Sequence, residues 1–265
     1  IRKVRLPDGR AIPVIPGSSW KGVFRSTAFS IANIEGLKVC EGLPEASCMR
    51  GDEFERMERR GEGTEERIKA VVSGEVRACL LCLTFGSPGL SSHVSFGESY
   101  PQGSYALGYR TCVAISRRTG AAYRRALFTV EYVEPGCKFG FKLIAENLPN
   151  YALGLLAEVM EQINAGLVKV GGLKSRGFGR VHFEDLELFV YSPKPEEWGV
   201  HDGCLKPLDP VDSEVEWPAG MDTRIRGEEA LEVLEELREA WRNALDKLRR
   251  ISGEGWKWGV VLSEE

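Results

Sequence analysis

The sequence predicts an α+β fold in which helices cover one face of a β-sheet. Strand-like segments with alternating apolar and polar residues are interrupted by helical segments, in the order strands, helix, strands, helix, strand. The composition, 43% hydrophobic and 28% charged over 265 residues, is that of a globular protein long enough to bury a sizeable core.

Residues 1–15 predict a β-hairpin. Residues 1–6 alternate between apolar and charged side chains, and residues 11–15 form a short apolar run. Pro7 to Arg10, which contains Asp-Gly after proline, gives the turn signal between them.

A helix is predicted directly after this hairpin. Ser18 or Ser19 can cap its start, and apolar or small side chains recur with helical spacing over residues 20–31. Lys21 and Arg25 lie four residues apart and therefore share one face. Free N–H groups, hydroxyls and two cations at one helix start can bind phosphate, and the alternative is a capped helix with a solvated face.

Further strands and two more helices are expected downstream. The predicted strands are 93–96, 107–116, 122–133, 138–145, 167–170 and 178–191. Apolar stripes predict an amphipathic helix over residues 150–165 and a long charged helix from about Gly227 to Arg250.

Residues 40–82 differ in character from their surroundings and predict an insertion with a small core. Its cysteines are Cys40, Cys48, Cys79 and Cys82. The last two form a C-x₂-C pair, so with the wider first pair they predict a structural, tetrahedral Zn²⁺ site. A metal would stabilise a segment whose apolar content is thin. Disulfides and free thiols stay open as alternatives, and His93 is a substitute ligand.

The net charge of −4 is unevenly distributed. Residues 1–27 carry six basic side chains against the single acid Asp8, and residues 110–125 carry five arginines and no acid. The electrostatic field of such basic clusters can steer an anionic partner toward them. Arg117 and Arg118 occupy a turn between two predicted strands, where they can contact phosphate or a base; an ordinary exposed hairpin is the alternative.

Residues 171–180 read Gly-Gly-Leu-Lys-Ser-Arg-Gly-Phe-Gly-Arg. Glycines allow positive φ and close approach to a ligand, and the cations and the aromatic ring suit a phosphate backbone and a base. The candidate RNA-binding residues of this loop are Lys174, Ser175, Arg176, Gly177 and Arg180. A glycine-rich turn with a solvated basic rim is the alternative.

Residues 15–26, Ile-Pro-Gly-Ser-Ser-Trp-Lys-Gly-Val-Phe-Arg-Ser, resemble the signature of the RAMP superfamily of CRISPR-associated proteins. Segments Leu83 to Ser87, Arg110 to Tyr132 and Gly171 to Gly179 resemble further family motifs in the same order, so the resemblance spans residues 9–190. Within this superfamily, the chain resembles the RNA-binding backbone subunit of type III effector complexes.

The resemblance implies a ferredoxin-like, RNA-recognition-motif-like core with insertions. The expected domains are a core of residues 1–39 plus 83–191, a zinc-finger-like insertion at 40–82, and a C-terminal extension at 192–265 with the long helix. The extension lies outside the segments that carry the resemblance.

The resemblance also implies partners. They are CRISPR RNA, a complementary target RNA, copies of the same chain and other effector subunits of an antiviral interference complex. Ser18, Ser19, Lys21 and Arg25 would contact the RNA backbone, together with the loop that contains Lys174 to Arg176.

The resemblance leaves endoribonuclease activity open. Some backbone subunits of the family cleave target RNA with a divalent metal such as Mg²⁺ and an aspartate located before the Ile-Pro-Gly-Ser-Ser motif, which we expect upstream of Ile1. No catalytic residue is therefore assigned within the chain. The Pro-Asp-Gly turn gives a structural reason for Asp8, which is therefore not assigned as a catalytic acid. His182 is expected to be structural.

Two other functions are compatible with parts of the pattern. One is a metal-independent endoribonuclease that processes CRISPR RNA. The Ile-Pro-Gly-Ser-Ser motif at residues 15–19 argues against this function. The other is a zinc-stabilised module that binds only protein, against which the basic clusters argue. No apolar run reaches the ~20 residues of a membrane helix. No signal peptide is visible, so we expect a cytoplasmic protein without membrane partners.

Overall fold

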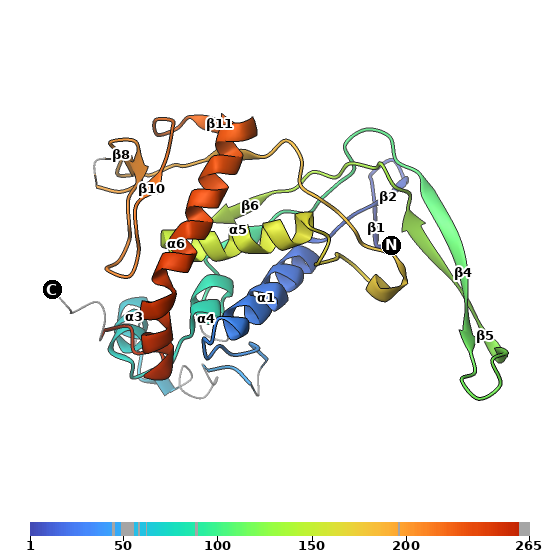
Figure 1. The fold of residues 1–265 in the computed structure, drawn as a ribbon, viewed down its shortest axis with the longest axis horizontal. Helices are drawn as coiled ribbons and strands as arrows, with labels where there is room; N and C mark the ends of the chain where they lie inside the picture. The colour runs from blue at the N-terminus through green and yellow to red at the C-terminus, as the bar shows by residue number, and fades with distance from the viewer. Residues whose placement is uncertain are drawn as a thin grey trace. The chain divides into compact units, whose positions relative to one another are not determined.

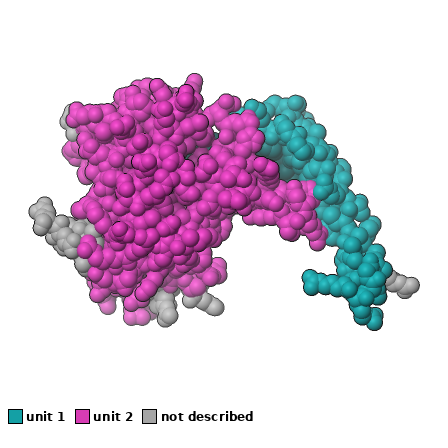
Figure 2. Space-filling view, viewed as in Figure 1, with its two compact units in different colours: residues 1–20, 96–144 teal, residues 21–95, 145–265 magenta. Residues whose placement is uncertain are grey.

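The computed structural model of the chain describes residues 1–43, 46–48, 56–57, 59–61, 63–87, 90–195 and 197–259. Figure 1 labels its helices and strands. The chain forms two compact units, which Figure 2 colours separately. The first holds residues 1–20 and 96–144, and the second holds residues 21–95 and 145–265.

The first unit contains the hairpin predicted for residues 1–15. β1 (Lys3–Arg5) pairs antiparallel with β2 (Ala11–Pro13). The carboxylate of Asp8 accepts a hydrogen bond from the backbone N–H of Arg10 at 2.9 Å and one from its guanidinium at 2.7 Å. Asp8 therefore stabilises the turn, as the Pro-Asp-Gly signal predicts.

A longer hairpin completes the first unit. β4 (Leu107–Ile115) pairs antiparallel with β5 (Ala122–Val133), and the chain turns through residues 117–120, as predicted. Large exposed side chains on this hairpin include Tyr109, Ile115, Tyr123 and Leu127.

Helix α1 (Gly17–Ile34) begins where the backbone of another segment passes very close. An ideal Cβ on Gly17 would lie 2.2 Å from the carbonyl oxygen of Phe96, so a glycine is required there. The helix begins one residue before Ser18. Both Ser18 and Ser19 therefore lie inside the first turn, and not at the N-cap position expected for one of them.

Two short helices form in the cysteine-rich segment. α3 (Thr64–Ser73) ends at Gly74, which adopts the left-handed conformation with φ 77°. α4 (Leu80–Phe85) is buried along most of its length. α3 carries Glu65 and Glu66 in its first turn, and part of the segment between Cys48 and α3 lies outside the described residues.

The two predicted long helices pack against each other in the second unit. α5 (Asn150–Asn164) and α6 (Gly227–Gly253) are confirmed, and Figure 1 shows α6 crossing α5. A buried cluster to which both helices contribute includes Trp217, Ile225 and, from α6, Val233. Of the helices that the structure describes, none has the length and apolar character required to cross a bilayer.

The remaining strands are short. They are β3 (Val94–Phe96), β6 (Leu143–Ala145), β7 (Glu187–Phe189), β8 (Val200–His201), β9 (Cys204–Leu205), β10 (Val215–Glu216) and β11 (Arg224–Arg226). β3 pairs with β6, β7 pairs with β11, and β8, β9 and β10 form a three-stranded sheet.

The fold is therefore mixed α/β with small antiparallel sheets, and the described strands pair only in twos and threes. A continuous ferredoxin-like sheet stays a prediction. The strand expected at residues 167–170 does not form, and only β7 forms within 178–191. The N–H groups of Leu167 and Val168 bond back to the carbonyl of Gln162 near the end of α5, so they are not available to a strand partner.

The boundaries of the two compact units fall at other positions than the expected domain boundaries, which the compact units do not test. The second unit combines most of α1, the cysteine-rich segment and the C-terminal extension. The expected boundaries of a core, an insertion and an extension stay a prediction.

Candidate metal centre and RNA-binding surfaces

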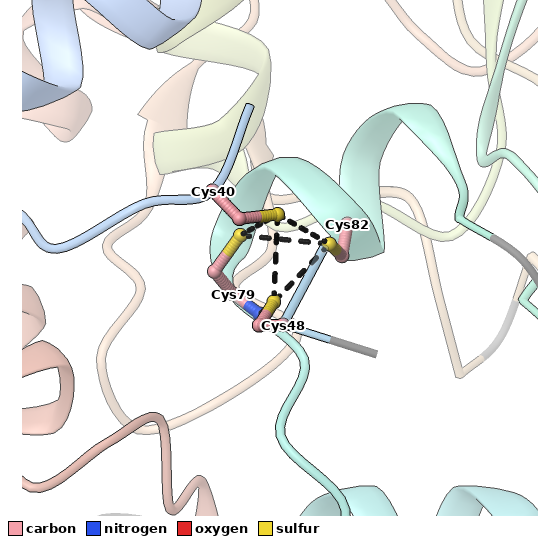
Figure 3. A group of neighbouring side chains, drawn as sticks. All are labelled: Cys40, Cys48, Cys79 and Cys82. Carbon is pink, nitrogen blue, oxygen red and sulfur yellow. Dashed lines mark hydrogen bonds between the residues drawn. The ribbon is translucent and has the colours of Figure 1, made fainter. Parts of the chain in front are cut away.

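Four cysteine side chains converge in the second unit, with their sulfurs pointing toward one another (Figure 3). This four-cysteine cluster consists of Cys40, Cys48, Cys79 and Cys82, and all four Sγ atoms lie within 4.8 Å of one another. The Sγ atoms of Cys40 and Cys82 are 3.2 Å apart, and those of Cys48 and Cys82 are 3.3 Å apart. The sequence prediction that these four residues form one site is confirmed as a spatial grouping.

Local structure places the C-x₂-C pair. Cys79 is the N-cap residue of α4 and Cys82 lies in its first turn, so the helix brings both thiols to one side. Both residues are completely buried. Cys40 follows α1, and the backbone N–H of Cys79 donates to the sulfur of Cys48 at 3.2 Å.

Hydrogen bonds among the four thiols shift their pKa values in different directions. The hydrogen bond between Cys40 and Cys48 lowers the pKa of the first thiol and raises the pKa of the second. Hydrogen bonds from Cys40 and the other two thiols raise the pKa of Cys82. Without a cation, ionisation of one thiol therefore opposes ionisation of its neighbours.

The donor set fits Zn²⁺. Four thiolates at about 2.3 Å from a tetrahedral Zn²⁺ would have sulfurs about 3.8 Å apart, close to the separations observed. All four thiols are free. His93, considered as a substitute ligand, instead has its Nδ1 2.9 Å from the carbonyl oxygen of Glu146. Four sulfur ligands form a closed structural site that leaves no position for a reacting water.

The start of α1 holds the second candidate site. Its helix-start cluster consists of Ser18, Ser19, Lys21 and Arg25, with Ser18 exposed and the other three half-buried. Nη1 of Arg25 donates to the carbonyl of Gly86 at 2.7 Å. Its Nη2 is buried and has no hydrogen-bond partner within the described part of the chain.

Lys21 and Arg25 interact electrostatically. Burial, and then the neighbouring Arg25 cation, lower the pKa of Lys21. No carboxylate of the described residues pairs with either cation. The sequence did not indicate the role of Gly42, where an ideal Cβ would lie 1.9 Å from Nη2 of Arg25; glycine leaves space for the guanidinium. Its only sequence signal is a glycine soon after Cys40.

The glycine-rich loop, residues 171–180, has an unusual backbone. Leu173 adopts φ 55°, which costs a side-chain-bearing residue about 1 kcal/mol or more, and a single 3₁₀ turn follows at Lys174–Arg176. The loop is closed by a hydrogen bond from the N–H of Val170 to the carbonyl of Gly179 at 2.8 Å. Lys174, Ser175, Arg176, Gly177 and Arg180 are all exposed.

The remaining candidates are Arg117, Arg118 and His182. Arg117 and Arg118 are exposed at the turn of the β4–β5 hairpin, in the first unit. His182 lies outside the strands, and its Nε2 is 2.5 Å from a carboxylate oxygen of Glu184. The prediction of a strand around His182 is therefore wrong. The contact with Glu184 gives His182 a local structural role.

Comparison with known families identifies the chain. A profile of the RAMP superfamily matches residues 3–182, so the chain belongs to the RAMP superfamily. A search of curated proteins found no match to the chain. Family membership supports an RNA-binding role among CRISPR-associated proteins. The matched range includes the four-cysteine cluster, the helix-start cluster and the glycine-rich loop, and it ends before β7.

Proposed function

We propose that this protein is a CRISPR RNA-binding backbone subunit of a type III antiviral interference complex. It assembles with copies of itself and other effector subunits along one CRISPR RNA, which pairs with a target RNA. Membership of the RAMP superfamily supports the RNA-binding part of this proposal. The helix-start cluster carries the argument further.

Lys21 and Arg25 are two cations that repel each other, and no carboxylate of the described residues pairs with them. A phosphate group bound beside these two cations would offset their repulsion. Ser18 and Ser19 lie in the first turn of the same helix, where their hydroxyls add donors for an anion at the positive end of the helix dipole. The N–H of Ser19 already donates to the carbonyl of Pro16 at 2.9 Å. An RNA backbone provides such phosphates at regular spacing.

The glycine-rich loop supports a second backbone contact. Its exposed Lys174 and Arg176 flank a hydroxyl at Ser175, and Gly177, with φ 90° and no neighbour near its Cβ position, keeps this surface open to close approach. These are the donor types that bind phosphate and sugar without reading sequence.

The four-cysteine cluster has a structural part in this proposal. Its residues bind one Zn²⁺, which holds the segment after α1 against α4. The cluster thereby fixes the chain on both sides of Arg25, since Gly42 and Gly86 contact that guanidinium.

The test is the salt dependence of single-stranded RNA binding. The double variant Lys21→Ala with Arg176→Ala should bind more weakly, and the slope of log K against log[salt] should become shallower by about 0.7 for each phosphate that the protein no longer neutralises. Lys69→Ala is the matched control, because Lys69 is exposed on α3 and pairs with Glu65. Wild-type affinity and slope in a folded double variant would show that these cations do not bind RNA.

A further inference from the structure

The segment after α6, residues 254–259, contacts both chain segments that carry the cysteines. The indole N–H of Trp256 donates to the carbonyl of Lys38, two residues before Cys40. The indole N–H of Trp258 donates to the carbonyl of Ala78 at 2.9 Å, directly before Cys79. Each tryptophan therefore binds the backbone next to a different cysteine of the cluster.

These tryptophans are part of the core. Trp256 is 3% exposed and Trp258 is 5% exposed, and their ring centroids are 5.5 Å apart. Two indoles packed together bury a large apolar area and hold their N–H groups in fixed directions. Their acceptor carbonyls would lose these partners if the segment moved away.

The backbone of Lys38 is held on both sides. Its N–H donates to Oγ of Ser252, at the end of α6, and its carbonyl accepts from Trp256. The residue through which the chain approaches Cys40 is thus bound to α6 and to the segment that follows it.

The other end of this segment packs on α3. An ideal Cβ on Gly74 would lie 2.5 Å from Cγ of Lys257, and one on Gly259 would lie 2.7 Å from the carbonyl oxygen of Val72. Close packing at two glycines fixes the segment where the chain leaves α3 toward Cys79.

We infer that Trp256 and Trp258 are positioning residues of the four-cysteine cluster. They set the separation between the segment that carries Cys40 and the segment that carries Cys79 and Cys82. Metal binding and docking of residues 254–259 are then coupled, and each strengthens the other by the same factor. This inference rests on the zinc site of the proposed function and is independent of RNA binding.

Zn²⁺ affinity of the full chain tests the inference. Trp258→Phe keeps an aromatic ring but removes the N–H donor, so it should bind Zn²⁺ about 10-fold more weakly in competition with a chromophoric chelator. Trp198→Phe is the matched control, because Trp198 is 48% exposed, and it should bind Zn²⁺ like the wild type.

A second measurement uses the wild-type chain and does not depend on whether a variant folds. Removing Zn²⁺ with a chelator should speed amide hydrogen exchange in residues 254–259 more than in α5. Wild-type Zn²⁺ affinity in a folded Trp258→Phe protein, or unchanged exchange after removal of Zn²⁺, would overturn the inference. Absence of Zn²⁺ binding by the wild type would refute the zinc site itself, whereas failure of the RNA-binding proposal would appear only in the salt-dependence experiment.

Discussion

Gly154 of α5 passes so close to Leu237 of α6 that an ideal Cβ on Gly154 would lie 1.9 Å from the carbonyl oxygen of Leu237. The obstacle is backbone rather than the flexible end of a side chain. The two helices can approach this closely only because the position has no side chain.

Gly154→Ala should therefore destabilise the protein. Because the clash is with backbone, the cost of forcing the helices apart should reach the upper part of the usual range for overpacking, about 3 kcal/mol, and so exceed the roughly 1 kcal/mol that alanine contributes through helix propensity. Urea unfolding checks this. Gly22→Ala in α1 is the control: nothing lies within 4 Å of its Cβ position, so this variant should be slightly more stable than the wild type. A stabilised Gly154→Ala would contradict the helix packing described.

Cys79→Ser should remove zinc and lower the melting temperature. At free Zn²⁺ of about 100 times Kd, linkage contributes about 2.7 kcal/mol, which corresponds to a decrease of about 5–10 °C for a chain of this size. A chelator should lower the melting temperature of the wild type but not of the variant. Cys112→Ser, on the β4–β5 hairpin, should keep one zinc per chain by elemental analysis. Sensitivity to reductant instead of chelator would favour a disulfide.

Asp212 links the C-terminal extension to the start of α5, and it gives a pH-dependent prediction. Its carboxylate accepts from the backbone N–H groups of Asn150 at 2.8 Å and Tyr151 at 3.1 Å. Burial raises the pKa of Asp212 above 3.8 despite these bonds. The folded state therefore binds the proton more tightly, so this group's contribution to stability falls as the pH rises from 3.8 through the folded-state pKa.

Asp212→Asn removes this titration and one of the two carboxylate acceptors. The variant should be less stable by about 1–3 kcal/mol because a buried donor loses its partner. Its deficit relative to the wild type should be largest at low pH and should shrink as the pH rises. Urea unfolding between pH 3.5 and 7 measures the deficit, with the exposed Asp246→Asn as the control. A deficit that grew with pH would show that the folded-state pKa is lowered.

Gly179→Ala should disrupt the glycine-rich loop and weaken RNA binding. Gly179 has φ 84°, and an ideal Cβ would lie 2.2 Å from the carbonyl oxygen of Val170, so the bond that closes the loop cannot form unchanged. Gly172→Ala is the control, because nothing lies within 4 Å of its Cβ position. Gel-shift titrations with single-stranded RNA should show a several-fold loss only for Gly179→Ala. Equal losses in both variants would point to the loop's composition instead of its closure.

Local patterns predicted the elements that local interactions determine. The Pro-Asp-Gly turn that contains Asp8 predicts a hairpin from neighbouring residues alone. The apolar stripes of α5 and α6 predict these helices in the same way. The grouping of the four cysteines was also predictable. The C-x₂-C spacing is typical of a zinc ligand pair, and a second cysteine pair lies in the same short segment.

Other features depend on contacts that no local pattern contains. Leu167 and Val168 have strand-like side chains, yet their N–H groups bond back to α5. Trp256 and Trp258 reach acceptors 218 and 180 residues away in sequence, so spacing gave no sign that they approach the cysteine cluster. Leu173 likewise adopts the αL conformation, which a leucine in the sequence does not indicate.

The cap that Asp212 provides for α5 bears on how the protein can be shortened. The family match ends at residue 182, yet α5 lies inside the match while its N-terminal cap and its packing partner α6 lie beyond it. A fragment cut at the end of the match would expose the apolar side of α5 and leave its first N–H groups without acceptors. We therefore expect that the end of the family match is not a limit of independent folding, and that a shortened chain must retain the extension through Trp258 to fold.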